Sequence, residues 1–358
     1  MTSIAAFTAS ATRTSSPAAP IPGPLRSTYD AGSSESPAKG LGKLVRSEGQ
    51  GPTGDAAVDA AHDNAGIVHD FYAQVLGRNS IDDAGMGITS VVHFGRSYNN
   101  AYWDGEKMTY GDGDGRTFSP LSGAVDVVGH EITHGMTEHT AQLTYRGQPG
   151  ALNESWSDVF GELIEQWSEH KDAFGTVDAA KGADWLIGED VFTPGTAGDA
   201  LRSMSRPGTA YKGDPQPADM AHYKRMSDDN GGVHVNSGIP NRAAYETAVR
   251  IGSEKLAKIW YTALSKHLTA NATFVDAARA TVLSATELYG SGTESQAVTD
   301  AWTAVGVLGA NAVLVPDTDA PDAGSDPADA DPDGGIVPKW LRDGTVTAAE
   351  QQALQVAS

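Results

Sequence analysis

The sequence predicts an α+β protein with two domains, the first containing short strands and the second mainly helical. The segment ITSVVHF at 88–94 is rich in β-branched residues, as strands are, and turns rich in glycine and asparagine follow it. Beyond about residue 240, apolar residues recur at helical spacing, as at Leu256, Ile259, Trp260 and Ala263. The 358 residues suffice for two hydrophobic cores.

The pattern places individual elements in order along the chain. We expect helices over 58–76, 123–138 and 151–167 and strands over 88–94 and 107–110, with an antiparallel sheet in the first domain. Thr293 with Gln296 has the spacing of a capping box and predicts the start of a further helix.

Composition divides the chain into five parts. Residues 1–45 are rich in Ala, Ser, Thr, Pro and Gly, which is typical of a flexible leader or a short precursor segment. An N-terminal α+β domain is expected over 46–150 and a C-terminal helical domain over 151–312. The acidic Asp/Pro linker 313–335 cannot bury enough apolar surface to fold alone, and the extension 336–358 offers one short helix.

Charge and composition exclude several kinds of partner and site. The formal charge of −21 argues against nucleic acid and anionic membranes, because phosphate binding requires clustered Lys and Arg. No run of eighteen apolar residues could span a bilayer. Without cysteine, the chain can bind a metal ion only through histidine and carboxylate. The first twenty residues lack the basic start and apolar run of a signal peptide.

The string HEITH at 130–134 predicts a metal site. His130 and His134 lie four residues apart, so a helix would place both imidazoles on one face, close enough to bind one zinc ion. Glu131 would lie beside the metal, where it can take a proton from zinc-bound water, and this spacing is typical of metalloproteases. Because such a string also arises by chance in roughly one sequence in a hundred of this length, a third ligand is needed.

The segment GALNESWSD at 150–158 offers that ligand. Glu154 and Asp158 lie four residues apart on the next expected helix, so one carboxylate can bind zinc while the other accepts the N–H of a ligating histidine. Taken alone, Glu154 is also explained as a carboxylate favoured by the helix dipole. The histidine pair shortly before it favours the role of ligand.

Further blocks, in order along about residues 42–310, resemble the thermolysin family of zinc metallopeptidases. They are YNNAYW at 98–103, GDGDG at 111–115, DVVGHEITH at 126–134, NE at 153–154, LRSM at 201–204 and DNGGVHVNSG at 229–238. Within the family, GKLVRSEGQ at 42–50 and IPNR at 239–242 are most similar to protealysin-like members, which are made with a short precursor segment.

The resemblance implies a thermolysin-like two-domain fold with the active-site cleft between the domains. It assigns His130, His134 and Glu154 to zinc and Glu131 to the role of general base, in agreement with the roles argued from spacing.

Further groups take part in the chemistry that the resemblance implies. Tyr145 and His234 would donate hydrogen bonds to the oxyanion of the tetrahedral intermediate, and one such donor is worth about 3 kcal/mol of the barrier. Asp229 would orient His234. Behind the zinc ligands, Asp158 and Asn153 are the expected supporting groups.

The resemblance also indicates how a substrate would bind. Asn100 and Ala101 are similar to the segment that holds the substrate backbone as an added strand, and Arg202 to the group that binds a carbonyl next to the scissile bond. The pocket for the side chain after that bond would be formed by Phe118, Leu121, Val127, Ile187, Val191 and Leu201. An ordinary core would also contain these six residues. Such a pocket predicts cleavage on the amino side of Leu, Phe, Ile or Val.

Acidic positions resemble the family's calcium sites. Asp126, Glu165, Asp184 and Glu189 match ligands beside the active site, and hard oxygen ligands suit calcium. The alternative is a set of solvated surface acids. Because Leu186 replaces an acidic residue there, one calcium ion is expected and a pair stays open. A second, loop-bound site is expected at Thr193, Thr196 and Asp199.

The sequence thus predicts a neutral zinc endopeptidase that acts on proteins or peptides. It would use one catalytic zinc ion and one or more structural calcium ions, and work as a monomer without nucleic-acid or membrane partners. We expect secretion, with a cytoplasmic location or non-classical export as the alternative. A non-catalytic binding protein on the same scaffold would have lost Glu131 or a zinc ligand, and none is lost.

Both ends of the chain carry hypotheses of their own. The apolar, Pro-rich stretch IPGPL at 21–25 is a candidate for an inhibitory segment in the cleft. The stretch 316–358 is either a docking module, for example one that binds a partner through calcium on its aspartates, or a solvated spacer with a frayed end.

Overall fold

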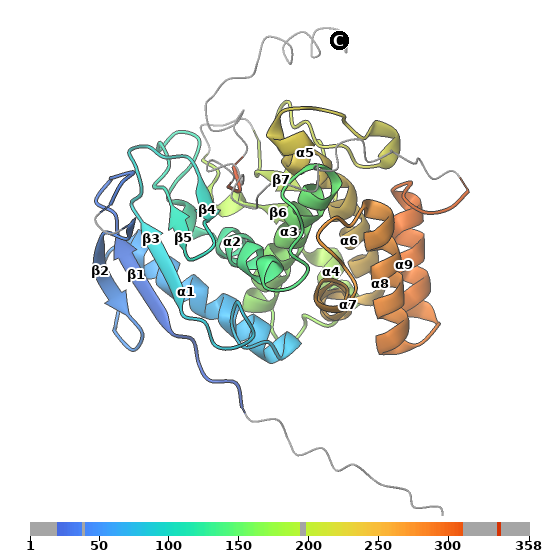
Figure 1. Ribbon diagram of the computed structural model, residues 1–358, viewed down its shortest axis with the longest axis horizontal. Coiled ribbons are helices and arrows are strands. Elements are labelled where there is room, and N and C mark those ends of the chain that lie inside the picture. The colour runs from blue at the N-terminus through green and yellow to red at the C-terminus, as the bar shows by residue number, and fades with distance from the viewer. Residues whose placement is uncertain (1–19, 38–39, 194–197, 311–334, 338–358) are drawn as a thin grey trace, which may run out of the picture.

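The computed structural model describes residues 20–37, 40–193, 198–310 and 335–337. A sheet with helix α1 forms one side of the molecule, helices α4 and α6 to α9 form the other, and α2 and α3 lie between them (Figure 1). The strands are β1 (Arg26–Asp30), β2 (Lys43–Ser47), β3 (Ile88–Val92), β4 (Ala101–Trp103), β5 (Met108–Tyr110), β6 (Leu186–Ile187) and β7 (Arg202–Ser203).

The helices follow the expected order. They are α1 (Ala56–Phe71), α2 (Val125–Glu138), α3 (Gly147–Glu169), α4 (Val177–Gly182), α5 (Asp229–Asn236), α6 (Gly238–Ile251), α7 (Ser253–Lys266), α8 (Phe274–Tyr289) and α9 (Thr293–Ala304). A π-helical turn at Tyr72–Leu76 continues α1, and short 3₁₀ helices occur at Leu121–Gly123, Glu189–Val191 and Met220–His222. The α+β architecture predicted from sequence is confirmed.

The five-stranded sheet has the order β2-β1-β3-β5-β4, and it is mixed. The prediction of an antiparallel sheet is wrong, because β3 pairs in parallel with both β1 and β5. Strand β1 also lies within 1–45, so the expectation of a flexible leader is wrong from Arg26 onward. Its sequence RSTYD is polar, yet Thr28 is buried and hydrogen-bonded to His62 of α1 (3.0 Å), which is why composition did not reveal the strand.

Local side chains explain where several helices begin. The Asp55 side chain accepts hydrogen bonds from the first backbone N–H groups of α1, and Thr273 with Asp276 forms a reciprocal capping box at α8. The capping box expected at Thr293 is wrong by one residue. The cap of α9 is Gly292, whose N–H donates to the Ser295 hydroxyl (3.1 Å), so Thr293 is already helical.

The close approach of α2 and α3 depends on two glycines. A Cβ at Gly161 would lie 2.6 Å from the Asp126 carbonyl oxygen, and one at Gly129 would lie 3.1 Å from the Gly161 Cα. Larger residues at these positions would push the helices apart. The two helices that carry the HEITH string and Glu154 are therefore held at backbone contact distance.

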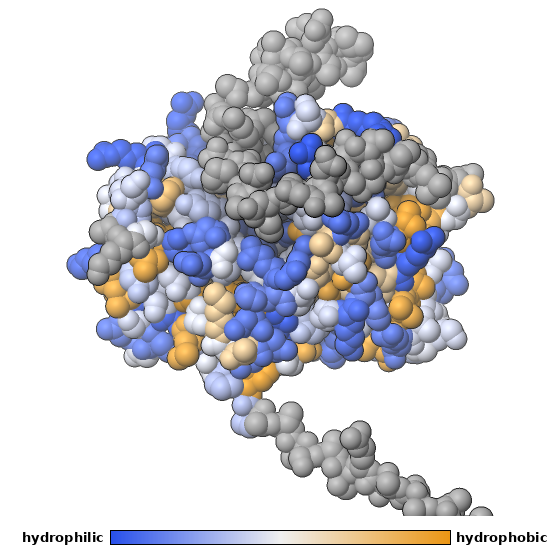
Figure 2. Space-filling model, in the orientation of Figure 1, coloured by the Kyte–Doolittle hydropathy of each residue, from blue (hydrophilic) through white to orange (hydrophobic). Residues whose placement is uncertain are grey.

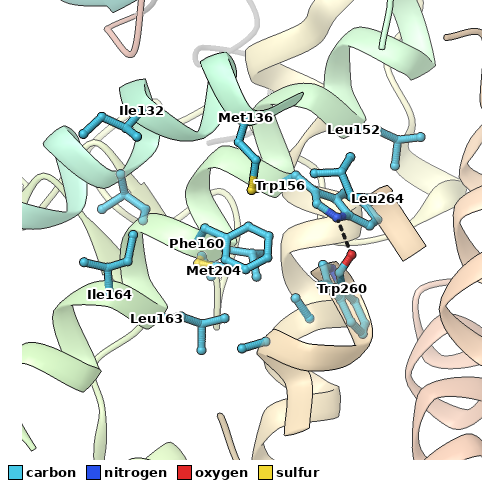
Figure 3. Packing of buried hydrophobic residues seen from close by; sticks show 14 of the residues in the cluster. Ile132, Met136, Leu152, Trp156, Phe160, Leu163, Ile164, Met204, Trp260 and Leu264 are labelled. Atoms are coloured by element: carbon cyan, nitrogen blue, oxygen red, sulfur yellow. Dashed lines mark hydrogen bonds between the residues drawn. The ribbon is translucent and has the colours of Figure 1, made fainter. Parts of the chain in front are cut away.

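The core beside this helix pair is filled by large apolar side chains of α2, α3 and α7 (Figure 3). Trp156 donates its indole N–H to the Trp260 carbonyl (3.1 Å), so its polar atom is satisfied in the apolar interior. Hydrophilic residues cover most of the molecular face shown in Figure 2, with scattered hydrophobic ones. Among the described residues, no helix combines the length and apolar character needed to cross a bilayer.

Candidate metal centre and active-site cleft

Three side chains from α2 and α3 converge on one point in the interior. The Nε2 atoms of His130 and His134 are 3.0 Å apart, and the Glu154 carboxylate lies 3.6 Å from the first and 3.4 Å from the second. His130 and Glu154 are fully buried. The spacing argument placed these residues together correctly.

The hydrogen bonds behind the imidazoles indicate that the point suits a cation. The Nδ1 atom of His130 faces the Asp158 carboxylate (2.9 Å) and that of His134 faces the Asn153 side-chain oxygen (2.9 Å). Both oxygens accept, so each Nδ1 carries the proton and each Nε2 presents a lone pair. Two lone pairs and a carboxylate facing one another repel unless a cation lies between them, and a His₂Glu set fits zinc.

Glu131 lies beside this cluster and is completely buried. Burial raises the pKa of its carboxyl group to about 7, although the neighbouring His130 opposes the shift. One oxygen accepts a hydrogen bond from the Ile336 N–H (3.3 Å), and the other has no hydrogen-bond partner among the described residues. A carboxyl group with a pKa near neutrality and a free oxygen suits proton transfer.

Asp158 connects His130 to the substrate side of the cleft. Besides His130, it accepts two hydrogen bonds from Arg202 (2.8 and 2.6 Å) and one from Asn241 (2.8 Å), all of them buried. Burial alone would raise the pKa of Asp158, but Arg202 and His130 hold it below its usual range. Sequence reasoning missed Asn241 and also Ser157, whose hydroxyl lies 3.2 Å from the His134 Nδ1.

Tyr145 and His234 approach the same point from the other side. The Tyr145 hydroxyl donates to Glu154 and lies 3.3 Å from the His234 Nε2. Asp229 faces the His234 Nδ1 (2.5 Å) and accepts the His234 backbone N–H (2.9 Å). Burial lowers the pKa of His234, but Glu154 and Asp229 outweigh it and raise the pKa to about 9. His234 is therefore a charged donor at neutral pH.

The backbone at the start of α5 makes this arrangement possible. Asp229 and Asn230 have φ values of 55° and 49°, and Gly231 and Gly232 continue the left-handed path with 83° and 85°. The four residues form a tight turn that points Asp229 back toward the His234 ring. Spacing alone did not reveal this role for the glycine-rich loop, whereas the family resemblance did.

Residues 335–337 of the chain itself lie beside the cluster, where they contact Glu131, His234 and Asn100 (Figure 1, the short red segment near β4 and β7). The Ile336 N–H donates to the Ala101 carbonyl (3.1 Å), the Val337 N–H to the Asn100 side-chain oxygen (2.9 Å), and Arg202 to the Ile336 carbonyl (2.8 Å). The groups expected to hold a peptide backbone therefore hold one. The sequence did not predict that this peptide would be the tail.

The expectation that residues 21–25 occupy the cleft is wrong. They lead into β1, where the Leu25 carbonyl accepts the Ile88 N–H (2.7 Å) and the Leu25 side chain is 65% exposed. Neither hypothesis for the C-terminal stretch, a docking module or a solvated spacer, predicted that part of it would bind in the chain's own cleft. The helix expected at Thr347 and most of the acidic linker lie outside the described residues.

The six residues expected to form the apolar pocket are all buried. Val127 lies in α2 and the other five lie in loops and short elements, and all six belong to the continuous hydrophobic core of the molecule. Leu201 donates its backbone N–H to the Ile187 carbonyl (2.8 Å), and Ser119 donates to Val191 (3.0 Å), which ties the segments together. The positions fit a pocket, and its role in specificity stays a prediction.

A second cluster, separate from the zinc ligands, consists of acidic side chains from α2, α3 and the segment 184–189. Asp126, Glu165 and Glu189 bring ligand atoms within 4.8 Å of one another, and so do Glu162, Glu165 and Asp184. The four acids expected at this place are thus brought together. Sequence reasoning missed Glu162, although it lies three residues before Glu165 and so on the same face of α3.

The protonation of this cluster reflects the repulsion among its carboxylates. Burial, followed by the charges of neighbouring acids, raises the pKa of Glu165 to about 11, that of Glu189 to about 8 and that of Glu162 well above its usual range. A calcium ion would favour the ionised forms, and carboxylate oxygens are its usual ligands.

The loop-bound calcium site stays a prediction. Thr193 donates its hydroxyl to the Arg116 carbonyl, and Asp199 is exposed, whereas Thr196 lies outside the described residues. Among the described residues, Asp199 belongs to no group of three or more His, Cys, Asp or Glu side chains whose ligand atoms converge.

Comparison with known proteins agrees with the geometry. A family model described as thermolysin metallopeptidase, catalytic domain, matches residues 14–138, and one described as thermolysin metallopeptidase, alpha-helical domain, matches 141–307. An extracellular metalloprotease of Pectobacterium carotovorum subsp. carotovorum is 46% identical over 275 residues, which are 74% of this chain and 77% of the relative.

Two further matches, one sequence and one solved structure, point to the same family. Thermolysin of Alicyclobacillus acidocaldarius subsp. acidocaldarius is 48% identical over 267 residues, or 71% of this chain, which spans 46% of that relative. The solved structure of a precursor of protealysin, a metalloproteinase from Serratia proteamaculans, matches with a TM-score of 0.75 and 44% identity, covering 82% of this chain and 91% of that one. The chain therefore belongs to the thermolysin family of metallopeptidases, which are endopeptidases that use catalytic zinc and structural calcium.

Proposed function

We propose that the chain, as a zinc-dependent neutral endopeptidase, hydrolyses peptide bonds in the cleft between α2, α3 and β4, with zinc held by His130, His134 and Glu154. The convergence of two Nε2 lone pairs and a buried carboxylate on one point supports this assignment most directly. Zinc bound there supplies a Lewis acid that polarises a carbonyl and lowers the pKa of water.

The remaining steps belong to side chains of the chain. Glu131 takes the proton from the attacking water and hands it to the leaving amine, which its raised pKa and its contact with a peptide nitrogen both favour. His234, charged and held by Asp229, donates to the carbonyl oxygen as negative charge develops, and Tyr145 turns from Glu154 to do the same.

Substrate position and preference follow from the contacts in the cleft. Asn100, Ala101 and Arg202 hold the backbone after the scissile bond, so a protein or peptide adds to the edge of β4 as a strand. The buried apolar side chains expected to line the pocket, Val127 among them, then favour Leu, Ile, Val or Phe directly after that bond.

The setting of the enzyme is proposed from its relatives. The Pectobacterium relative is named an extracellular metalloprotease and the Serratia structure is a precursor, so we propose a secreted enzyme made with a short precursor segment. We also propose that the chain acts as a monomer, without nucleic-acid or membrane partners. Calcium bound by Asp126, Glu165, Glu189 and Asp184 would stabilise the fold.

A comparison of Glu131→Gln with Glu254→Gln on casein tests the proposal. Glu254→Gln is the control, because it removes the same charge at an exposed position on α7, where Glu254 pairs with Lys258. Loss of the base should slow hydrolysis by about 10²–10⁴-fold, whereas the control should match the wild type. A zinc chelator should abolish casein hydrolysis by both the wild type and Glu254→Gln. Casein cleavage by Glu131→Gln at the wild-type rate would refute the assignment.

A further inference from the structure

We propose that the chain is also its own substrate and hydrolyses the peptide bond between Gly335 and Ile336. The inference rests on the proposed function, since the same groups would perform the cleavage. It concerns a particular bond of this chain, which the described contacts place within the catalytic groups.

On each side of that bond, a polar atom of the peptide group faces a side chain with the matching chemistry. The Gly335 carbonyl oxygen lies 2.9 Å from the His234 Nε2, which must donate because a carbonyl only accepts. The Ile336 nitrogen lies 3.3 Å from the Glu131 carboxylate. The donor thus faces the oxygen that gains charge during water attack, and the base faces the nitrogen that needs a proton to leave.

The chain after the bond is fixed in one direction and register. The Ile336 N–H donates to the Ala101 carbonyl, the Val337 N–H to Asn100, and Arg202 donates to the Ile336 carbonyl. These three contacts hold two successive residues as a strand beside β4. A reversed segment could not present the same donors and acceptors, so the register leaves only the bond before Ile336 between His234 and Glu131.

Side chains of the tail fit their places. Ile336 and Val337 are fully buried and belong to the continuous hydrophobic core of the molecule. At Gly335, a Cβ would lie 2.0 Å from the Ala101 carbonyl oxygen and 2.5 Å from the Asn100 amide nitrogen. The sequence Gly-Ile-Val therefore combines the absence of a side chain where the backbone approaches closely with apolar side chains where the cleft is apolar.

The tail can reach the cleft within one molecule. An extended chain advances about 3.3 Å per residue, so the stretch 311–334 is long enough to connect the end of α9 with Gly335. Such a tether gives an effective concentration of about millimolar, well above that of a typical external substrate. The uncut tail should therefore also compete with other peptides.

The reaction is an ordinary hydrolysis and needs only water. The water oxygen bonds to the Gly335 carbonyl carbon, and Glu131 takes the released proton. The bond from that carbon to the Ile336 nitrogen breaks, and the proton passes from Glu131 to this nitrogen. The products are a chain that ends in the Gly335 carboxylate and a free peptide, 336–358, that begins with the Ile336 amine.

The test follows the intact mass of the full-length chain after zinc is added to protein purified in chelator. The expected products end at Gly335 and begin at Ile336, and a chain isolated already cut at this bond counts as the expected result. For cleavage within one molecule, the fraction cut per minute stays constant over a tenfold range of protein concentration. Glu131→Gln should stay full length.

Two tail variants and a control examine the fit. Ile336→Asp should slow cleavage about 100-fold or more, because an ionised carboxylate is disfavoured in an apolar pocket. Gly335→Val should slow it as well, through the clash with Ala101. Both should still hydrolyse a fluorogenic peptide with a central Gly–Leu bond, which shows that they are folded. Leu288→Asp, a change of the same kind on the exposed face of α8, should be cut like the wild type.

Several results would overturn the inference. They are a wild type that hydrolyses the external peptide but stays intact or is cut at another bond, Ile336→Asp cut at wild-type rate, and cleavage whose fractional rate rises with protein concentration. A wild type that hydrolyses neither its tail nor the external peptide with zinc bound would instead refute the proposed function.

Discussion

Removal of the negative charge of Asp158 should weaken the fold and the metal site by separately measurable amounts. Asp158→Asn keeps the shape of the side chain but leaves the buried guanidinium of Arg202 without its counter-charge. Breaking a buried pair of this kind costs about 3–5 kcal/mol of unfolding free energy. His130 also loses its charged acceptor at Nδ1, and loss of such a partner lowers metal affinity about 10–100-fold, or about 1.4–2.7 kcal/mol.

The unfolding free energy and the zinc affinity are measured in two assays, both in a Glu131→Gln background, which prevents self-digestion. Urea unfolding of metal-free protein gives the unfolding free energy, and competition for zinc with a chelator gives the zinc affinity. Glu254→Gln is the control, because its pair with Lys258 is exposed and is worth about 0.3–0.5 kcal/mol. An Asp158→Asn protein that loses no more stability than this control, or that keeps full zinc affinity, would refute the reasoning.

Two further predictions concern calcium and pH. Added calcium should stabilise metal-free protein by about 2.7 kcal/mol at 100 times the Kd and so raise its Tm. Glu162→Gln should raise the metal-free Tm, because burial raises the pKa of Glu162 and the protein must protonate this group on folding, and it should reduce the gain from calcium, because one ligand is lost; equal gains in both proteins would argue against the site. Burial lowers the pKa of His93, but the carboxylates of Asp112 and Asp55 outweigh burial and raise the pKa. The stabilisation that protonated His93 gives the fold is therefore complete below the unfolded pKa of about 6.5 and is lost as pH rises through the folded pKa. His93→Asn, which tolerates the φ of 54°, should therefore lose more urea stability at pH 6 than at pH 9, and an equal loss at both would contradict this.

The parts of the site that sequence reasoning found are those set by short-range geometry. His130, His134 and Glu154 lie on two consecutive helices, so periodicity alone places their side chains on known faces. Tyr145 and His234 lie 89 residues apart and meet only through the packing of α3 against α5, which no spacing encodes. The family resemblance supplied them.

The structural features that the sequence did not predict depend on tertiary contacts of segments that are polar or have no clear hydrophobic pattern. Strand β1 is polar because it lies between β2 and β3 with partly exposed side chains, so it lacks the alternation that reveals a half-buried strand. Gly335 and Ile336 follow an acidic stretch whose composition predicts no folded unit. Their place depends on the fit of three residues into a cleft that is formed by segments more than a hundred residues earlier.

The shared carboxylate of Asp158 links two binding events. It contacts His130 on one side and Arg202 on the other, while Arg202 also contacts the peptide carbonyl in the cleft. Coupling free energy is reciprocal, so a peptide that tightens metal binding by some factor is itself bound more tightly by that factor when the metal is present. The affinity for zinc and the affinity for a peptide in the cleft are therefore coupled through one carboxylate, and hydrolysis of the tail, by releasing one of the two ligands, ends that coupling.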